Sequence, residues 1–204
     1  MNYLMKRKIV KKAKAKKYQQ SGLTLIEMVV SLAVVMFIAT IFIFNYRDSN
    51  KRTDLIMASQ VMVSDIHRAQ NNSLGLLQYG DVVPSGGWGV YFDLATRDRY
   101  TIFPDLQDVG ETGYHDFNPE TEGDINKGAR VIELAPEIEI DSIYLGETNP
   151  RDNVAITFLP PDPRVNIYSG GSTSIDLYID IKDLRSGTIK RMFVNFLGLA
   201  EIID

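Results

Sequence analysis

The chain has 204 residues, with 22 Lys and Arg against 26 Asp and Glu, and it contains no cysteine. The lack of cysteine excludes disulfides, a lipoprotein anchor and a zinc site built from the usual Cys and His ligands. The charges are also unevenly placed, because the first acid in the chain is Glu27.

A basic segment precedes an apolar one at the N-terminus. The run from Leu23 to Phe44 has one charged residue, Glu27. At about 1.5 Å per residue, a helix of this length spans the hydrocarbon core of a bilayer. The basic residues before it predict a single-pass protein of the cytoplasmic membrane, with its N-terminus cytoplasmic and its C-terminal part exported. These residues are Lys6, Arg7, Lys8, Lys11, Lys12, Lys14, Lys16 and Lys17.

The apolar run does not have the form of an ordinary secretory signal. Such a signal has an apolar core of roughly 7 to 15 residues and ends in a small-x-small cleavage site. Here the run is longer and is followed by Asn45, Tyr46 and Arg47. A processing site would therefore lie before the apolar run.

The residues from Gly22 to Glu27, Gly-Leu-Thr-Leu-Ile-Glu, followed by an apolar helix, resemble the class III signal of type IV prepilins and type II secretion pseudopilins. The resemblance implies that prepilin peptidase cuts between Gly22 and Leu23 and that the new N-terminus at Leu23 is methylated. It also implies that Glu27 is needed for assembly. The first mature residue is usually Phe in this family, whereas here it is Leu23.

The chemistry of Glu27 agrees with an assembly role. An acid in a membrane helix costs about 2.5 to 3.5 kcal/mol at mid-bilayer and less near the surface, so it calls for a partner. Cleavage would create a positive amine at Leu23, four residues earlier, and the same amine on a neighbouring subunit would neutralise the carboxylate. The alternative is a glutamate that snorkels to the headgroups in a simple anchor.

Removal of residues 1–22 makes the rest of the chain strongly acidic. Taking 8 basic residues from 22 leaves 14 against 26 acids, a net charge of −12. Such a surface repels phosphate backbones, which argues against general nucleic-acid binding. The lysine-rich leader is better explained by membrane topology than as a nucleic-acid arm.

After Phe44 the sequence keeps a helical period through about Leu77, which predicts one unbroken helix from Leu23 to that point. No proline occurs before Pro84, whereas many pilins have a proline where Phe44 stands. The predicted divisions are a cleaved leader (1–22), a membrane or filament-core helix (23–44), an amphipathic helix (45–78) and an exported β domain (79–204). The residues on the buried face of the amphipathic helix would be Leu55, Ala58, Met62, Ile66, Ala69 and Ser73.

Turn residues from Asp81 to Gly87 separate the helix from a β-rich region. Within that region, Ile175, Leu177, Ile179 and Ile181 alternate with polar residues and Tyr178, which predicts one buried and one wet face. The fold class is therefore α+β, with the long helix packed on an antiparallel sheet, as in type IV pilins. The predicted strands are Trp88–Asp93, Arg99–Phe103, Arg130–Leu134, Glu137–Leu145, Val154–Leu159, Val165–Tyr168, Ser174–Ile181 and Thr188–Phe196.

Three later segments resemble one branch of the family, the GspH/FimT-like minor pilins and pseudopilins. They are residues 64–70 near the helix end, the stretch from Trp88 to Asp93, and the terminal hairpin from Ser186 to Gly198. Only the N-terminal motif is strong, and the stretch from Trp88 is moderately specific, since an amphipathic strand with a buried tryptophan would be expected with or without the resemblance.

An acidic loop from Asp105 to Asp124 has the oxygen ligands that calcium prefers, but its spacing fits no EF-hand. A solvated loop is the alternative, and no other cofactor is expected. The two histidines, His67 and His115, are far apart in the sequence. The acids of the loop are Asp105, Asp108, Glu111, Asp116, Glu120, Glu122 and Asp124.

The sequence contains no phosphate-binding loop, nucleophile elbow or His-Glu-x-x-His motif, so an enzyme is not expected. The first functional hypothesis is a structural subunit of a type IV pilus or type II secretion filament at the cell surface or in the periplasm. Its partners would be prepilin peptidase, other subunits, the inner-membrane assembly platform and membrane lipid. The second is a pilin-like binding module for DNA uptake, adhesion or substrate capture. The third is an anchored domain that never assembles.

Overall fold

The computed structural model describes residues 24–107, 115–117, 129–159 and 165–203, and for residues 44–52 it describes the backbone only. The chain divides into two compact units, residues 1–44 and 45–204, and each is described by itself. The helix α1, Leu25–Leu74, contributes residues to both units. The predicted α+β class with antiparallel sheets is confirmed.

In the first unit, the described residues 24–43 are all exposed. Met28 N donates to the carbonyl oxygen of Thr24 at 3.1 Å, which closes the first helical turn. The predicted leader, including the Gly22–Leu23 bond, lies outside the described residues.

The second unit begins with the C-terminal part of α1, residues 45–74, whose buried face follows the predicted period. Leu55, Met62, Ile66 and Ala69 are buried in the core, and Ala58 packs against it at partial burial. Ser73 is buried for a different reason, because its hydroxyl accepts a hydrogen bond from Trp88 N at 2.6 Å. Apolar packing therefore holds this stretch of α1, and a polar contact fixes its end to the first strand.

Eleven strands are described in the second unit, and all their pairings are antiparallel. The six-stranded sheet has the order β3-β2-β1-β6-β7-β8. Its strands are β1 (Gly87–Asp93), β2 (Arg99–Asp105), β3 (Arg130–Glu133), β6 (Asn153–Phe158), β7 (Val165–Ser169) and β8 (Ser172–Ser174). A short 3₁₀ helix, η1 (Leu94–Thr96), joins β1 to β2.

The five-stranded sheet has the order β11-β10-β9-β4-β5. The chain passes between the two sheets three times, before β4, before β6 and before β9, so residues distant in sequence share each sheet. The strands are β4 (Ile138–Leu145), β5 (Asn149–Arg151), β9 (Asp176–Asp183), β10 (Ile189–Asn195) and β11 (Ala200–Ile203).

Both sheets contribute to one hydrophobic core. Val90 and Phe92 of β1 are fully buried in it, together with Ile179 of β9 and Val194 of β10. The other face of the six-stranded sheet is also covered, because Phe117 contacts Tyr91 and Phe103 with ring centroids 4.7 and 5.0 Å apart. This cover explains why Phe103 is buried although it faces away from the shared core.

Two details of the predicted strand Ser174–Ile181 are wrong. Ile175 is 68% exposed, because β8 ends at Ser174 and β9 begins only at Asp176, in the other sheet. Asp180, predicted on the wet face, is 6% exposed, because Arg191 covers it with two hydrogen bonds of 2.6 and 2.7 Å. The alternating pattern located the strand. Where the strand begins, and whether a side chain of the adjacent strand covers one of its residues, depend on the neighbouring strands.

Candidate functional site

The described chain begins inside the predicted processing motif, at Thr24. Thr24 caps α1, since its side-chain oxygen accepts a hydrogen bond from Glu27 N at 3.3 Å. A threonine at the cap with a glutamate three residues later has the spacing of a capping box, which satisfies free N–H groups at a helix start. The motif therefore also sets where α1 begins, and it places Glu27 in the first turn.

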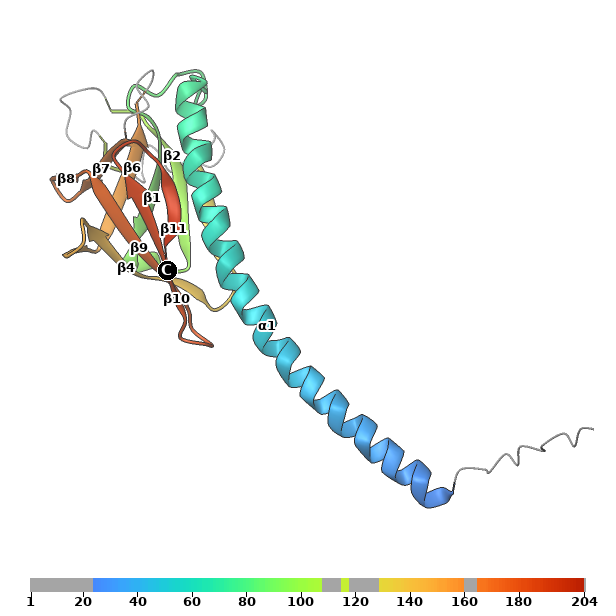
Figure 1. The fold of residues 1–204 in the computed structure, drawn as a ribbon. Coiled ribbons are helices and arrows are strands. Elements are labelled where there is room, and N and C mark those ends of the chain that lie inside the picture. The colour runs from blue at the N-terminus through green and yellow to red at the C-terminus, as the bar shows by residue number, and fades with distance from the viewer. Residues whose placement is uncertain (1–23, 108–114, 118–128, 160–164, 204) are drawn as a thin grey trace, which may run out of the picture. The chain divides into compact units, whose positions relative to one another are not determined.

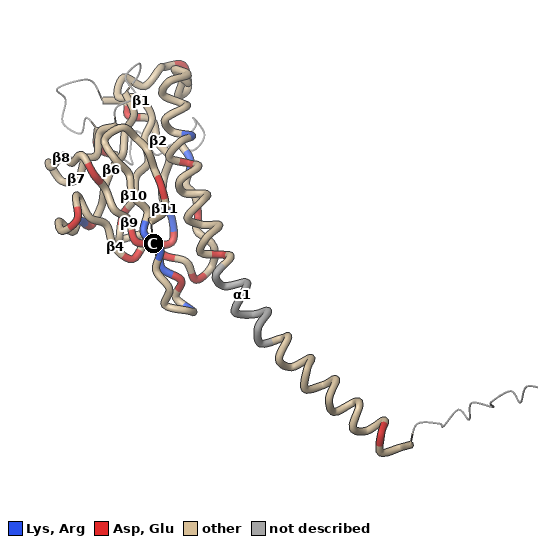
Figure 2. Tube along the Cα trace, in the orientation of Figure 1, with Lys and Arg blue, Asp and Glu red and all other residues tan. Residues whose placement is uncertain are grey.

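Glu27 is the only charged side chain in the described part of the first unit, at the start of an otherwise uncharged segment (Figure 2). It is exposed, and within the described residues its carboxylate makes no hydrogen bond or ion pair. A negative charge in the first helical turn interacts favourably with the helix dipole. That contribution stabilises α1 locally but leaves the carboxylate available to a cation on another molecule.

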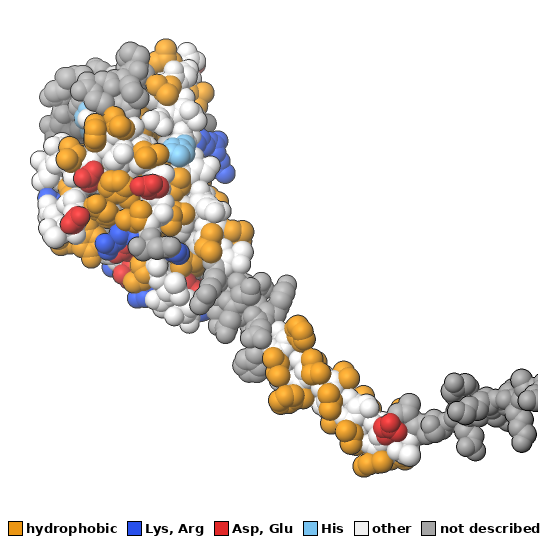
Figure 3. Space-filling model, viewed as in Figure 1, with side chains coloured by type: hydrophobic (Ala, Val, Ile, Leu, Met, Phe, Trp, Pro, Cys, Tyr) orange, Lys and Arg blue, Asp and Glu red, His pale blue; other side chains and the backbone are white. Residues whose placement is uncertain are grey.

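The apolar part of α1, Leu25–Ile43, is long and apolar enough to cross a membrane, and none of it is buried within the protein. It is the one such helix among the described residues. Figure 3 shows hydrophobic side chains covering it. Its hydroxyls are satisfied within the helix: Ser31 donates to Glu27 O at 2.7 Å, and Thr40 donates to Met36 O at 2.8 Å. This surface is suited to lipid or to the apolar helices of other subunits.

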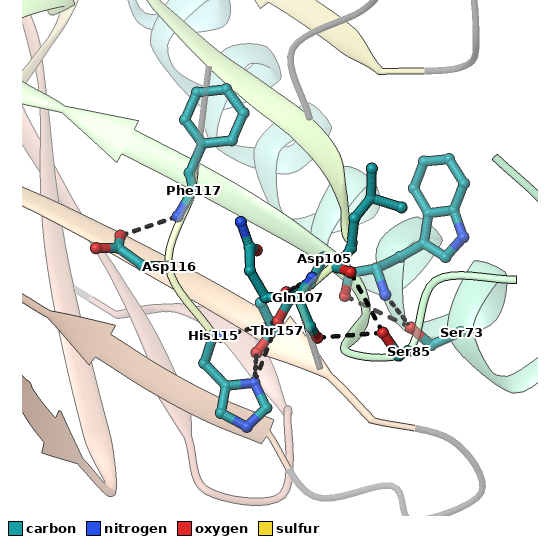
Figure 4. A network of polar contacts seen from close by, with 10 residues as sticks. Ser73, Ser85, Asp105, Gln107, His115, Asp116, Phe117 and Thr157 are labelled. Atoms are coloured by element: carbon teal, nitrogen blue, oxygen red, sulfur yellow. Dashed lines mark hydrogen bonds and ion pairs between the residues drawn. The ribbon is translucent and has the colours of Figure 1, made fainter. Parts of the chain in front are cut away.

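A second candidate site lies on the covered side of the six-stranded sheet, where Asp105, His115 and Thr157 meet (Figure 4). Asp105 is fully buried, and one of its carboxylate oxygens accepts a hydrogen bond from His115 N at 2.9 Å and lies 3.4 Å from His115 Nδ1. Thr157 Oγ1 lies 2.9 Å from the same Nδ1. No spacing in the sequence brings these three residues together, because they lie on separate segments.

These groups do not form a hydrolase triad. In a triad, one ring nitrogen of the histidine faces the nucleophile and the other faces the acid. Here both contacts are made to Nδ1. The arrangement instead holds the segment of residues 115–117 over the sheet.

The pKa values of Asp116 and Tyr91 are raised, chiefly by burial at the segment that covers the sheet. Burial raises the pKa of Asp116, against the lowering effect of a hydrogen bond from Phe117 N, and the nearby charge of Asp105 raises it further. Burial also raises the pKa of Tyr91 to about 12, and the charges of Asp93 and Asp116 add to the effect.

The calcium prediction falls mostly outside the described residues. Of the seven acids in the predicted loop, Asp105 and Asp116 are described. Asp105 is already bonded to Gln107 N and His115 N, and Asp116 accepts a hydrogen bond from Phe117 N. Within the described ranges no group of three or more His, Asp or Glu could hold a metal. His67 lies on α1 and is not part of this network.

Residues 17–43 match the model of the prokaryotic N-terminal methylation motif. The match includes Gly22, Leu23 and Glu27, and it extends through the exposed apolar segment of α1. It supports a type IV pilin-like or pseudopilin subunit that prepilin peptidase processes and that assembles with other pilin subunits. It indicates a structural subunit rather than an enzyme. The apolar helix and the motif together fit membrane anchoring and a pilus or pseudopilus.

The searches of curated proteins and of solved structures found no match to the chain.

Proposed function

We propose that the chain is a minor pilin or pseudopilin of the GspH/FimT-like branch, a low-abundance structural subunit of a type IV pilus or type II secretion filament. One observation carries the proposal: the methylation motif runs directly into an apolar helix that the protein itself leaves uncovered. A helix with this surface is stable only in lipid or among other apolar helices. A subunit that passes from the membrane to a filament core would meet both environments.

Maturation would proceed at the Gly22–Leu23 bond. Cleavage would remove the basic leader and leave a positive amine at Leu23, and N-methylation would keep that charge. The Thr24 cap supports this geometry, because it fixes the start of α1 so that Glu27 lies in the first turn. The carboxylate of Glu27 would then pair with the amine of a neighbouring subunit in an apolar bundle, where an unpaired charge is costly. The basic leader supports an N-terminus on the cytoplasmic side.

Processing is tested first, by intact-mass analysis of the chain from cells with and without prepilin peptidase. With the peptidase, we expect the mass of residues 23–204 plus one methyl group, and without it the mass of the whole chain. Gly22→Val should block cleavage, whereas Ser21→Ala, one residue away, should leave it unchanged. A chain that keeps Met1 in both strains would exclude the proposal.

Assembly is tested separately, with Glu27→Ala and Glu27→Gln. Both variants should enter the membrane normally and be missing from sheared filaments, because each removes the charge that the amine requires. Ser31→Ala is the matched control: it lies one turn later on the same exposed helix, and its hydroxyl bonds only the carbonyl of Glu27. Normal incorporation of Glu27→Ala would show that assembly does not need the carboxylate.

A further inference from the structure

A row of aromatic side chains crosses the outward face of the five-stranded sheet. Tyr144 of β4 is paired with Tyr178 of β9, Tyr178 with Phe193 of β10, and Phe193 with Glu201 of β11. Directly paired residues of antiparallel strands project from the same face. The sequence neighbours of Tyr178, Leu177 and Ile179, are fully buried in the core, so this row faces outward. Figure 3 shows hydrophobic and acidic side chains gathered over these strands.

One end of this row already holds a cation from the protein itself. The guanidinium carbon of Arg191 lies 5.6 Å from the ring centroid of Tyr144 and 5.8 Å from that of Tyr178. Asp180 accepts hydrogen bonds from Arg191 Nε and Nη2 at 2.6 and 2.7 Å. Ring faces attract a cation and a bidentate carboxylate orients it, so this end is a complete guanidinium site.

The other end has a second ring and two further carboxylates, and it shares Tyr178 with the Arg191 site, since the Arg191 guanidinium carbon lies 5.8 Å from the centroid of that ring. The rings of Tyr178 and Phe193 are 5.0 Å apart, and Asp176 projects from the same face as Tyr178, two residues earlier. Glu201 lies opposite Phe193 and is exposed. Within the described part of the chain, the carboxylates of Asp176 and Glu201 make no ion pair. These four residues, Asp176, Tyr178, Phe193 and Glu201, are called the aromatic cradle.

We propose that the aromatic cradle binds an arginine side chain presented by a protein partner. Aromatic residues and arginine are enriched at the centres of protein interfaces, and the two carboxylates provide the charge that a guanidinium needs. A nucleic acid is disfavoured because the acids of the cradle repel phosphates. A second copy is disfavoured because residues 23–204 carry a net charge of −12. The inference concerns the exported unit and goes beyond the proposed filament role.

The test is a chemical-shift titration of the full-length protein in detergent micelles. One probe is acetyl-Gly-Arg-Gly-amide, and the other replaces arginine by citrulline, which has nearly the same shape but no charge. The arginine peptide should shift the amides of residues 176–178, 193 and 201, and it should bind at least tenfold more tightly than the citrulline peptide. Equal binding of the two peptides, or shifts elsewhere only, would overturn the proposal.

Two variants with the same change of charge separate the cradle from general attraction. Asp176→Asn with Glu201→Gln should weaken binding of the arginine peptide at least tenfold. Asp81→Asn with Glu133→Gln removes two exposed acids outside the cradle and should change binding less than twofold. An equal loss in both double variants would show that only net charge matters.

A further variant, Phe193→Leu, keeps the acids and most of the apolar bulk. It should weaken binding severalfold because it removes a ring, and unchanged binding would contradict the role given to the aromatic pair. Concentration-dependent shifts of the cradle amides without peptide would assign the surface to a second copy and refute the choice of a different partner.

Discussion

The apolar segment of residues 24–43 and the second unit, residues 45–204, called the exported unit after its proposed location, use the same kinds of side chains in opposite ways. Phe37 in the first is 69% exposed, whereas Phe92 in the second is fully buried. The apolar segment gains nothing from tertiary contacts within its own chain, so lipid or other subunits must cover it. The exported unit buries a core of its own. The apolar segment therefore depends on other molecules for its cover, whereas the fold of the exported unit rests on its own core.

Truncating one phenylalanine in each region tests this difference with the largest expected effect. Phe92→Ala should lower the free energy of unfolding of the exported unit by about 3 to 5 kcal/mol, because it leaves a cavity among packed side chains. Phe37→Ala should leave that value within about 0.5 kcal/mol, as expected of an exposed position. Denaturant titration of the full chain in detergent, followed by the fluorescence of buried Trp88, measures both.

If Phe37→Ala destabilised the exported unit as much as Phe92→Ala, the two regions would share a core and the comparison would fail. The same two variants should have the reverse ranking for filament incorporation per folded molecule, since only Phe37 lies on the surface that other subunits would cover.

A smaller effect is expected where α1 is attached to the six-stranded sheet. The hydroxyl of the buried Tyr100 donates a hydrogen bond to Asp65 at 2.7 Å, across 35 residues of sequence. Tyr100→Phe keeps the ring and removes this charge-assisted bond, so it should cost about 1.5 to 3 kcal/mol, measured by the same denaturant titration. Tyr168→Phe is the control, because within the described residues its hydroxyl makes no hydrogen bond. Equal losses from the two variants would show that the contact with Asp65 adds nothing.

The fold could largely be predicted because its signals are local. Apolar spacing found the buried face of α1, and alternation found eight of the strand regions. The short strands β5, β8 and β11 were missed. Each has three or four residues, and β5 contains Pro150, so too little pattern is present for a local signal. The error at Ile175 has a similar origin, because the switch from β8 to β9 depends on which sheet each strand joins.

The candidate sites likewise divide into those marked by a local sequence motif and those formed by residues distant in sequence. The prediction that Glu27 acts in assembly came from a motif within a few residues, and it stays a prediction. The cleavage and methylation of Gly22 and Leu23 stay predictions. The contact of His115 with Asp105 and Thr157, and the aromatic cradle, depend on strand register and on passages between sheets. No spacing in the sequence specifies that register, so only a structure could reveal them.

The smallest expected effect is a change of folding stability with pH. It bears on the comparison because it should arise in the exported unit alone. Burial tends to raise the pKa of Asp183, but hydrogen bonds from Arg185 N and the Ser186 hydroxyl, with the charge of Arg185, lower it overall. A carboxyl with a lowered folded-state pKa contributes stability above its unfolded pKa of about 4. That contribution is lost as the pH falls from about 4 through the folded pKa.

Denaturant titrations between pH 2 and 7 should therefore show a smaller loss of stability at low pH for Asp183→Asn than for the wild type. Asp98→Asn is a useful comparison, since the pKa of Asp98 is also lowered, chiefly by hydrogen bonds from Arg99, but both side chains are exposed. Solvent screens such a pair, so this variant should follow the wild-type pH profile closely. If Asp183→Asn followed it equally closely, the hydrogen bonds to buried Asp183 would contribute no pH-dependent stability to the exported unit.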